Sequence, residues 1–197
     1  MGETHDAVPM RLARGEDIDV VIMVGYALHK LADEGKIVPG TSVDLVRSLI
    51  GVAVKAGAPH PDISTPEALK QTLLNARSIA YSDSASGVYI QNELFKKLGI
   101  ETEVMPKAHM IPATPVAQIV AEGKAELGFQ QIAELKPVPG VDLLGPIPES
   151  LQSVTIFSAG VVGTSHNVDE AKALIACLAS PQSAPAVKET GLEPMAK

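Results

Sequence analysis

The chain has 197 residues, of which 46% are hydrophobic and 3% aromatic, and its formal net charge is −7. This length suits one large domain or two small lobes, and the apolar content is ample for a core. Because a phosphate backbone requires clustered lysine or arginine and no basic run is present, the composition argues against a nucleic-acid partner.

Three further classes of feature are missing from the sequence pattern. A single cysteine, Cys177, excludes an internal disulfide, and its apolar surroundings predict that it is buried. No stretch is long and apolar enough to span a membrane. The first residues lack the basic and apolar regions of a secretory signal, so the chain taken alone indicates no location.

The first third of the chain alternates apolar runs with helical patterns. A helix is expected over residues 4–15, a buried strand over 19–24 and a helix over 25–34 that ends at Gly35. A second buried strand follows at 49–54, and a capping-box pattern at 64–67 starts a helix that reaches about residue 76. Because an α/β domain usually opens with a strand, we expect an upstream strand and helix to be absent from this chain.

Residues 78–99 are the most informative segment. They predict a short apolar strand, a loop with Ser82, Ser84 and Ser86, and an amphipathic helix closed by Gly99. Unpaired N–H groups and the helix dipole favour an anion just ahead of such a helix, and the loop has no lysine or arginine. The alternative is that one serine caps the helix while the others only solvate the loop.

The second half continues the alternation. Thr114-Pro115 predicts the start of a helix over 116–122, and strands are expected at 126–130, 141–144 and 153–162. Asn167 is expected to cap a helix, and a last helix runs from about residue 181 to 191. The Pro/Gly-rich region 136–148 is interpreted as a surface connection rather than a site. The whole pattern predicts an α/β fold with mostly parallel sheets flanked by helices.

Four segments, in order, resemble one family: residues 12–22, 82–99, 116–131 and 173–191. The chain is similar to the molybdate-binding-protein-like branch of the type II periplasmic substrate-binding proteins. The resemblance implies two α/β lobes with ligand bound in a cleft between them, and a periplasmic solute-binding component that serves an ABC transporter permease. Lobe one would comprise residues 1–54 and 153–197, and lobe two residues 55–152. The family's first strand and helix have no counterpart here, so self-association through the truncated lobe is expected.

The resemblance also implies a ligand site. In the family, hydroxyl and backbone N–H groups bind a small oxyanion without cationic side chains. Gln131 falls where molybdate binders carry a tyrosine, and we prefer it to Gln130 as the residue facing the cleft. The more polar pocket favours a small organic acid over a molybdate-type oxyanion. The expected ligand-binding residues are Gly2, Glu3, Thr4, Ser84, Ser86, Gly87, Thr114, Val116 and Gln131.

Capture of a small anionic solute, without cofactor or metal, is therefore the favoured function. Some relatives resemble aconitate isomerases, so the alternative is an enzyme that shifts a proton along a tricarboxylate. Its candidate acid or base groups are Glu3, His5, Lys107 and His109. The five histidines lack metal-ligand spacing, and each is expected to be solvated. A regulator's effector domain of similar shape is a third class, which the lack of a DNA-binding helical segment disfavours.

Overall fold

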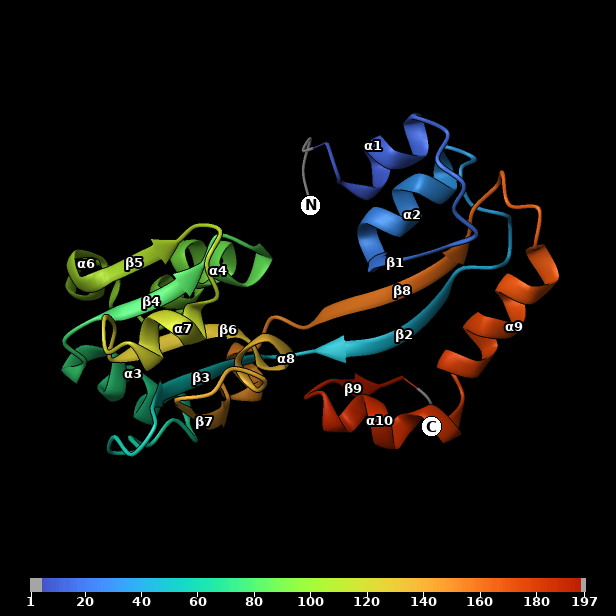
Figure 1. Ribbon diagram of the computed structural model, residues 1–197. Coiled ribbons are helices and arrows are strands. Elements are labelled where there is room, and N and C mark those ends of the chain that lie inside the picture. Colours follow the sequence, from blue (N-terminus) through green and yellow to red (C-terminus); the bar gives the residue numbers. More distant parts are fainter. Residues whose placement is uncertain (1–4, 196–197) are drawn as a thin grey trace. The chain divides into compact units, whose positions relative to one another are not determined.

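The computed structural model describes residues 5–195 and divides the chain into two compact units (Figure 1). Unit 1 consists of Met1–Arg47, Thr155–Glu189 and Glu193–Lys197. Unit 2 consists of Ser48–Val154 and Thr190–Leu192. Each unit has a β-sheet with helices packed on it, which confirms the expected α/β class.

Unit 1 is built on a four-stranded sheet in the order β1-β8-β2-β9, in which β1 lies at an edge. Its strands are β1 (Val20–Val24), β2 (Val43–Ser48), β8 (Thr155–Val161) and β9 (Glu193–Pro194). Its helices are α1 (Val8–Ala13), α2 (Gly25–Asp33), α9 (Val168–Leu178), a 3₁₀ turn Pro181–Ser183 and α10 (Ala184–Glu189). Strand β1 feeds directly into α2, which buries Leu28 and Leu31 against Val21 and Met23.

Unit 2 is built on a five-stranded sheet in the order β5-β4-β6-β3-β7. Its strands are β3 (Ile50–Lys55), β4 (Ile79–Ser82), β5 (Ala108–Ile111), β6 (Leu127–Gln131) and β7 (Val141–Pro146). Its helices are α3 (Pro66–Asn75), α4 (Ala85–Tyr89), a π-helical turn Ile90–Leu94, α5 (Phe95–Lys97), α6 (Glu101–Val104), a 3₁₀ turn Met105–Lys107, α7 (Val116–Ala121), α8 (Ile132–Leu135) and a 3₁₀ turn Glu149–Leu151.

The strand directions correct the expectation of mostly parallel sheets. In unit 2, β4 pairs in parallel with β5 and with β6, whereas β3 pairs antiparallel with both β6 and β7. In unit 1, β1 is antiparallel to β8 and β2 is antiparallel to β9. Both buried apolar runs and alternating runs occur in mixed sheets, so the apolar pattern alone does not fix strand direction.

The two faces of the unit 2 sheet differ in the size of their side chains. On one face, Tyr81 and Phe129 belong to the large core that includes side chains of α3, the π-helical turn, α5 and α6. On the other, Ala80 and Gly128 face α7, and a Cβ atom added at Gly128 would lie 2.5 Å from Val120 Cγ2. Small residues therefore let α7 pack close to the sheet.

Most of the expected elements are present, with boundaries shifted by a few residues. The N-cap of α3 is Thr65, whose hydroxyl accepts the Ala68 N–H at 3.1 Å, one residue later than the expected box begins. Strands β2, β5 and β9 were not expected. Cys177 lies exposed on α9, so the prediction that it is buried is wrong: the buried residues of that helix are Ala171 and Ile175.

Candidate functional site

The serine loop forms a compact hydroxyl cluster between β4 and α4. The Ser82 and Ser84 hydroxyls are 2.7 Å apart, and the Ser86 hydroxyl lies 3.2 Å from Ser82 and 3.1 Å from Ser84. Ser82 and Ser86 are buried, whereas Ser84 is exposed. The cluster depends on Gly87, because a Cβ atom there would lie only 1.5 Å from the Ser82 carbonyl oxygen.

A pocket of about 540 Å³, which we call the serine pocket, opens beside this cluster. Its residues come from the ends of β4 and β6 and from the segments that follow β4, β5 and β6, and β4 pairs in parallel with the other two strands. Because the carboxyl ends of parallel strands meet at one edge of a sheet, these distant segments converge there. The lining residues are Ser82, Asp83, Ser84, Ala113, Thr114, Pro115, Gln130, Glu134, Pro137 and Val138.

The turn before α7 contributes strained backbone to this pocket. Ala113 has a φ of +54°, a left-handed conformation that a residue with a Cβ atom rarely adopts. Such strain occurs frequently where a structure fixes a ligand-binding surface.

A buried amide connects α7 with α8 across the pocket wall. The Val116 N–H donates to Gln130 Oε1 at 3.0 Å, so the side-chain amide of Gln130 turns its NH₂ group away from α7. That amide is hydrogen-bonded to the Glu134 carboxyl group. Desolvation by the surrounding protein raises the pKa of Glu134, and the hydrogen bond from Gln130 opposes part of that increase.

The structure brings some of the expected ligand residues to this pocket and places others elsewhere. Ser84 and Thr114 line it, while Ser86 lies behind in the hydroxyl cluster. The Val116 N–H is already paired with Gln130. Gln131 accepts a hydrogen bond from Ser48 Oγ at 2.7 Å and is not among the lining residues, whereas its neighbour Gln130 is. Gly2, Glu3 and Thr4 lie outside the described residues.

The three described acid–base candidates do not line the serine pocket. The Lys107 ammonium donates to the Leu74 and Ala76 carbonyls, both at 2.6 Å, and so satisfies the end of α3. His109 is exposed on β5. The fourth candidate, Glu3, lies outside the described residues.

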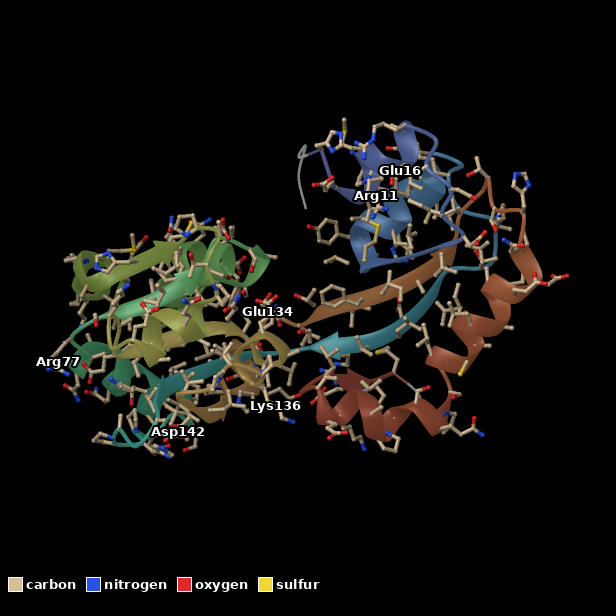
Figure 2. The ribbon with its side chains drawn as sticks, viewed as in Figure 1. Arg11, Glu16, Arg77, Glu134, Lys136 and Asp142 are labelled. Atoms are coloured by element: carbon tan, nitrogen blue, oxygen red, sulfur yellow. The ribbon has the colours of Figure 1, made fainter. Side chains whose placement is uncertain are left out.

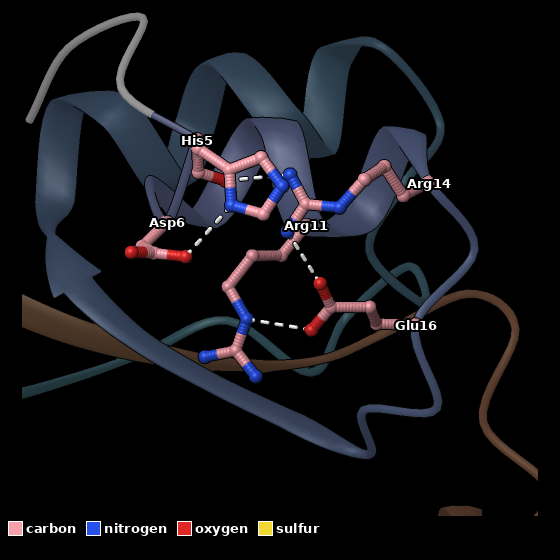
Figure 3. Close-up of polar contacts among 5 residues, drawn as sticks. All are labelled: His5, Asp6, Arg11, Arg14 and Glu16. Carbon is pink, nitrogen blue, oxygen red and sulfur yellow. Dashed lines mark hydrogen bonds and ion pairs between the residues drawn. The ribbon is translucent and has the colours of Figure 1, made fainter.

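His5 belongs to an exposed polar group at the start of unit 1 (Figure 3). Its Nδ1 lies 3.0 Å from Asp6 Oδ1, and its carbonyl accepts a hydrogen bond from Arg14. Arg11 and Arg14 both pair with Glu16, and their bonds lower the pKa of that carboxyl group. Ion pairs this exposed contribute little to stability, so the group indicates a solvated surface rather than a reaction site.

Sequence reasoning did not single out Asp83 or Glu134, and it ranked Gln130 second to Gln131; all three of Asp83, Gln130 and Glu134 line the serine pocket. A signal for Gln130 was present: it follows Gly128 by two positions on β6, so it shares the face of small residues against which α7 packs. Glu134 and the lining residues Pro137 and Val138 follow β6 directly, within or beside the region interpreted as a surface connection.

Unit 1 contains a second pocket, also of about 540 Å³, which we call the apolar pocket. It lies beside the edge strand β1 and contains the exposed side chains of Ile22 and Tyr26. Its lining residues are Asp6, Ala7, Val8, Pro9, Ile22, Met23, Val24, Tyr26, Ala27, Lys30, Leu31, Glu34 and Phe157.

Metal-binding clusters and membrane-spanning helices are both absent from residues 5–195. Within that range, no group of three or more His, Cys, Asp or Glu side chains is arranged to bind a metal ion. None of the helices described there has the length and apolar character needed to cross a membrane.

Comparison with known proteins identifies the family. A curated aconitate isomerase from Pseudomonas sp is 50% identical over 195 residues, which cover 99% of this chain and 74% of that protein. The substrate-binding domain of a protein described as a molybdenum ABC transporter from Clostridium difficile superposes with a TM-score of 0.78 at 21% identity, covering 93% of this chain and 80% of that one. The periplasmic molybdate-binding protein of Azotobacter vinelandii superposes with a TM-score of 0.61 at 19% identity, covering 92% and 80%. The model of the family described as "Bacterial extracellular solute-binding protein" matches residues 3–193, and the chain belongs to that family.

Proposed function

We propose that this protein binds a small tricarboxylate of the aconitate class in the serine pocket and interconverts its isomers. The observation that carries the proposal is the 50% identity to an aconitate isomerase over 99% of this chain. The two solved structures are 21% and 19% identical to this chain, so they support the fold and do not identify the ligand.

The chemistry of the serine pocket suits a carboxylate ligand that is recognised through hydrogen bonds. Ser84 and Thr114 supply hydroxyl donors, and none of the ten lining residues is lysine, arginine or histidine. A hydrogen bond to a charged group contributes about 1.5–3 kcal/mol, so a few such donors can bind a carboxylate without a cation.

Two lining carboxyl groups, Asp83 and Glu134, oppose the binding of an anion when both are ionised. The hydroxyl groups of Ser84 and Thr114 offset this repulsion, because each can donate a hydrogen bond to a carboxylate of the ligand.

Nuclear magnetic resonance tests the proposal directly. The protein is incubated with trans-aconitate in H₂O and, separately, in D₂O. We expect the cis isomer to appear in the first sample and deuterium to enter the methylene and vinyl positions in the second. Absence of both isomerisation and exchange, at an aconitate concentration that saturates the protein in a thermal-shift measurement, would contradict the isomerase proposal.

Capture of a solute for an ABC transporter is the second candidate. Membership of the solute-binding family supports this candidate. The candidate also implies an extracytoplasmic location and a transporter partner. A thermal-shift panel of aconitate, citrate, molybdate and tungstate separates the two, because a ligand at ~100 times its dissociation constant stabilises by about 2.7 kcal/mol. Stabilisation by aconitate or citrate without turnover supports organic-acid capture, and stabilisation by molybdate or tungstate alone supports oxyanion capture.

A further inference from the structure

Glu134 contributes a carboxyl group to the wall of the serine pocket, and strand β6 and helix α8 determine its position. Glu134 lies in α8, which begins directly after β6, and Figure 2 shows it on that helix. Gln130 precedes it by four residues and lies at the end of β6, so both side chains reach the same pocket. Strand β6 and helix α8 therefore fix the approach of the carboxyl group to a ligand.

The orientation of this carboxyl group is set by the backbone of α7. Because Gln130 Oε1 accepts the buried Val116 N–H at 3.0 Å, its amide cannot flip without leaving that N–H unpaired. The NH₂ group is thereby directed to Glu134, with which it is hydrogen-bonded. Such a bond orients the carboxyl group and leaves its other lone pairs available to a substrate.

On the basis of the proposed function, we infer that Glu134 is the catalytic residue that carries the proton between the two carbon atoms of the tricarboxylate. One Glu134 oxygen removes a proton from the methylene carbon, so a C–H bond breaks and an O–H bond forms. The electron pair spreads over the three-carbon allylic unit and its carboxylates.

The second half of the step returns the proton. The O–H bond of Glu134 breaks, a C–H bond forms at the other terminal carbon, and the double bond has moved by one position. Atoms and charge balance, no oxidant or cofactor takes part, and the carboxylate of Glu134 is regenerated.

The setting of Glu134 suits this role better than that of the other lining carboxylate. A partly desolvated carboxylate with a raised pKa is a stronger base than an ordinary glutamate, which favours removal of a proton from carbon. Asp83 and Glu134 are both exposed, but only Glu134 of these two is hydrogen-bonded to the Gln130 amide, which the α7 backbone holds in place. Asp83 serves as the competing assignment in the experiment.

The experiment compares Glu134→Gln, Asp83→Asn and a control, Glu103→Gln, which changes an exposed glutamate on α6. Isomerisation of trans-aconitate, deuterium exchange into it and its dissociation constant are measured for each. Because general acid–base catalysis contributes about 10²–10⁴-fold, we expect Glu134→Gln to lower both rates at least 100-fold. Its dissociation constant should stay the same or decrease, because the neutral amide does not repel the anion, and Glu103→Gln should match the wild type.

The outcomes separate the inference from the proposed function. An active wild type with an equally active Glu134→Gln, or with activity lost only in Asp83→Asn, would overturn the role of Glu134 and leave the isomerase proposal intact. An inactive wild type would overturn both. If Glu134→Gln fails to fold, Glu134→Asp is measured instead. Its side chain is one methylene shorter, so the carboxyl group lies farther from the ligand. We then expect a drop of at least tenfold in both rates with ligand binding retained, and an unchanged rate would overturn the inference.

Discussion

The two pockets of this protein have the same volume, about 540 Å³, and opposite chemistry. The apolar pocket of unit 1 lies beside an edge strand and is lined mainly by aliphatic and aromatic side chains. The serine pocket of unit 2 is formed where three parallel strands end, and brings together hydroxyls, an amide and two carboxyl groups. The convergence of polar groups, and not the size of the cavity, therefore distinguishes the candidate site.

The difference has a structural cause. In unit 2, the chain leaves each parallel strand at the same edge of the sheet, so three loops meet. In unit 1, the pairings of β1 with β8 and of β2 with β9 are antiparallel, and β1 continues directly into α2 without a loop. The apolar pocket beside β1 is therefore lined mainly by aliphatic and aromatic side chains.

The largest effect is expected at the glycine on which the serine pocket depends. In Gly87→Ala, the new methyl group would overlap the Ser82 carbonyl oxygen, so the end of β4 and helix α4 would have to move apart. We expect the free energy of unfolding to fall by about 3 kcal/mol and ligand binding to be lost. Urea denaturation and calorimetry measure both.

Gly163→Ala is the matched control for that substitution. A Cβ atom at Gly163 would have its nearest neighbours at 3.4 Å, and its φ is not positive, so stability should change little. Equal effects of the two variants would contradict the role assigned to Gly87.

A pair of substitutions tests which of the two pockets binds the ligand. Ser84→Ala removes a hydroxyl from the serine pocket, and because a hydrogen bond to a charged group contributes about 1.5–3 kcal/mol, affinity should fall roughly tenfold or more. Ile22→Ser changes a side chain that is 51% exposed in the apolar pocket and should leave affinity unchanged. Isothermal titration with trans-aconitate measures both.

Ser150→Ala, which alters an exposed serine elsewhere in unit 2, controls for loss of a surface hydroxyl. The comparison between the pockets fails if Ile22→Ser weakens binding and Ser84→Ala does not.

A third prediction concerns Gln130. In Gln130→Leu, the Val116 N–H loses its acceptor while it remains buried, and an unpaired buried donor costs about 1–3 kcal/mol. Glu134 also loses the bond that orients it, so the turnover number should decrease more than the Michaelis constant changes. Thermal unfolding and steady-state kinetics measure these effects. A stability equal to that of the wild type would contradict the buried hydrogen bond.

The smallest effect is expected in the pH dependence of stability. The pKa of Glu134 is raised in the folded protein, so the folded state binds more protons than the unfolded state between the ordinary value of about 4.3 and the raised value. Stability is therefore lost as pH rises through this window. Glu134→Gln lacks that loss and should have a higher Tm than the wild type above the window and an equal Tm below it.

This pH test also separates catalysis from structural support. A glutamate that stabilises the fold would make Glu134→Gln less stable at neutral pH, whereas a desolvated catalytic base makes it less active and more stable. A lower Tm for the variant above the window would count against the desolvation assigned to this carboxyl group.

Local sequence signals predicted much of the fold because they act within a few residues. The apolar run before Gly25, the Pro66 start of α3 and the glycine that closes the helix at Gly99, where φ is +65°, each report a local conformational preference. The serine loop was recognised on the same basis, since small hydroxyl residues ahead of an amphipathic helix are a local pattern.

Other features depend on partners far along the chain. The antiparallel direction of β3 relative to β6, and the exposure of Cys177, depend on which elements pack together. Strand β5 is short and lies at a sheet edge with two exposed positions, so its own residues indicate little.

The sequence by itself determined the α/β alternation, the family and the hydroxyl loop, because each is recognised from patterns within short segments of the chain. Only the tertiary structure decided that Gln130 rather than Gln131 lines the serine pocket, and that Glu134 lies beside it. The physical reason is that a strand presents neighbouring residues to opposite faces, and the identity of the covering helix decides which face meets the site. Small residues on the face of Gly128 allow α7 to pack close to the sheet, and this packing places the Val116 N–H within hydrogen-bond distance of Gln130.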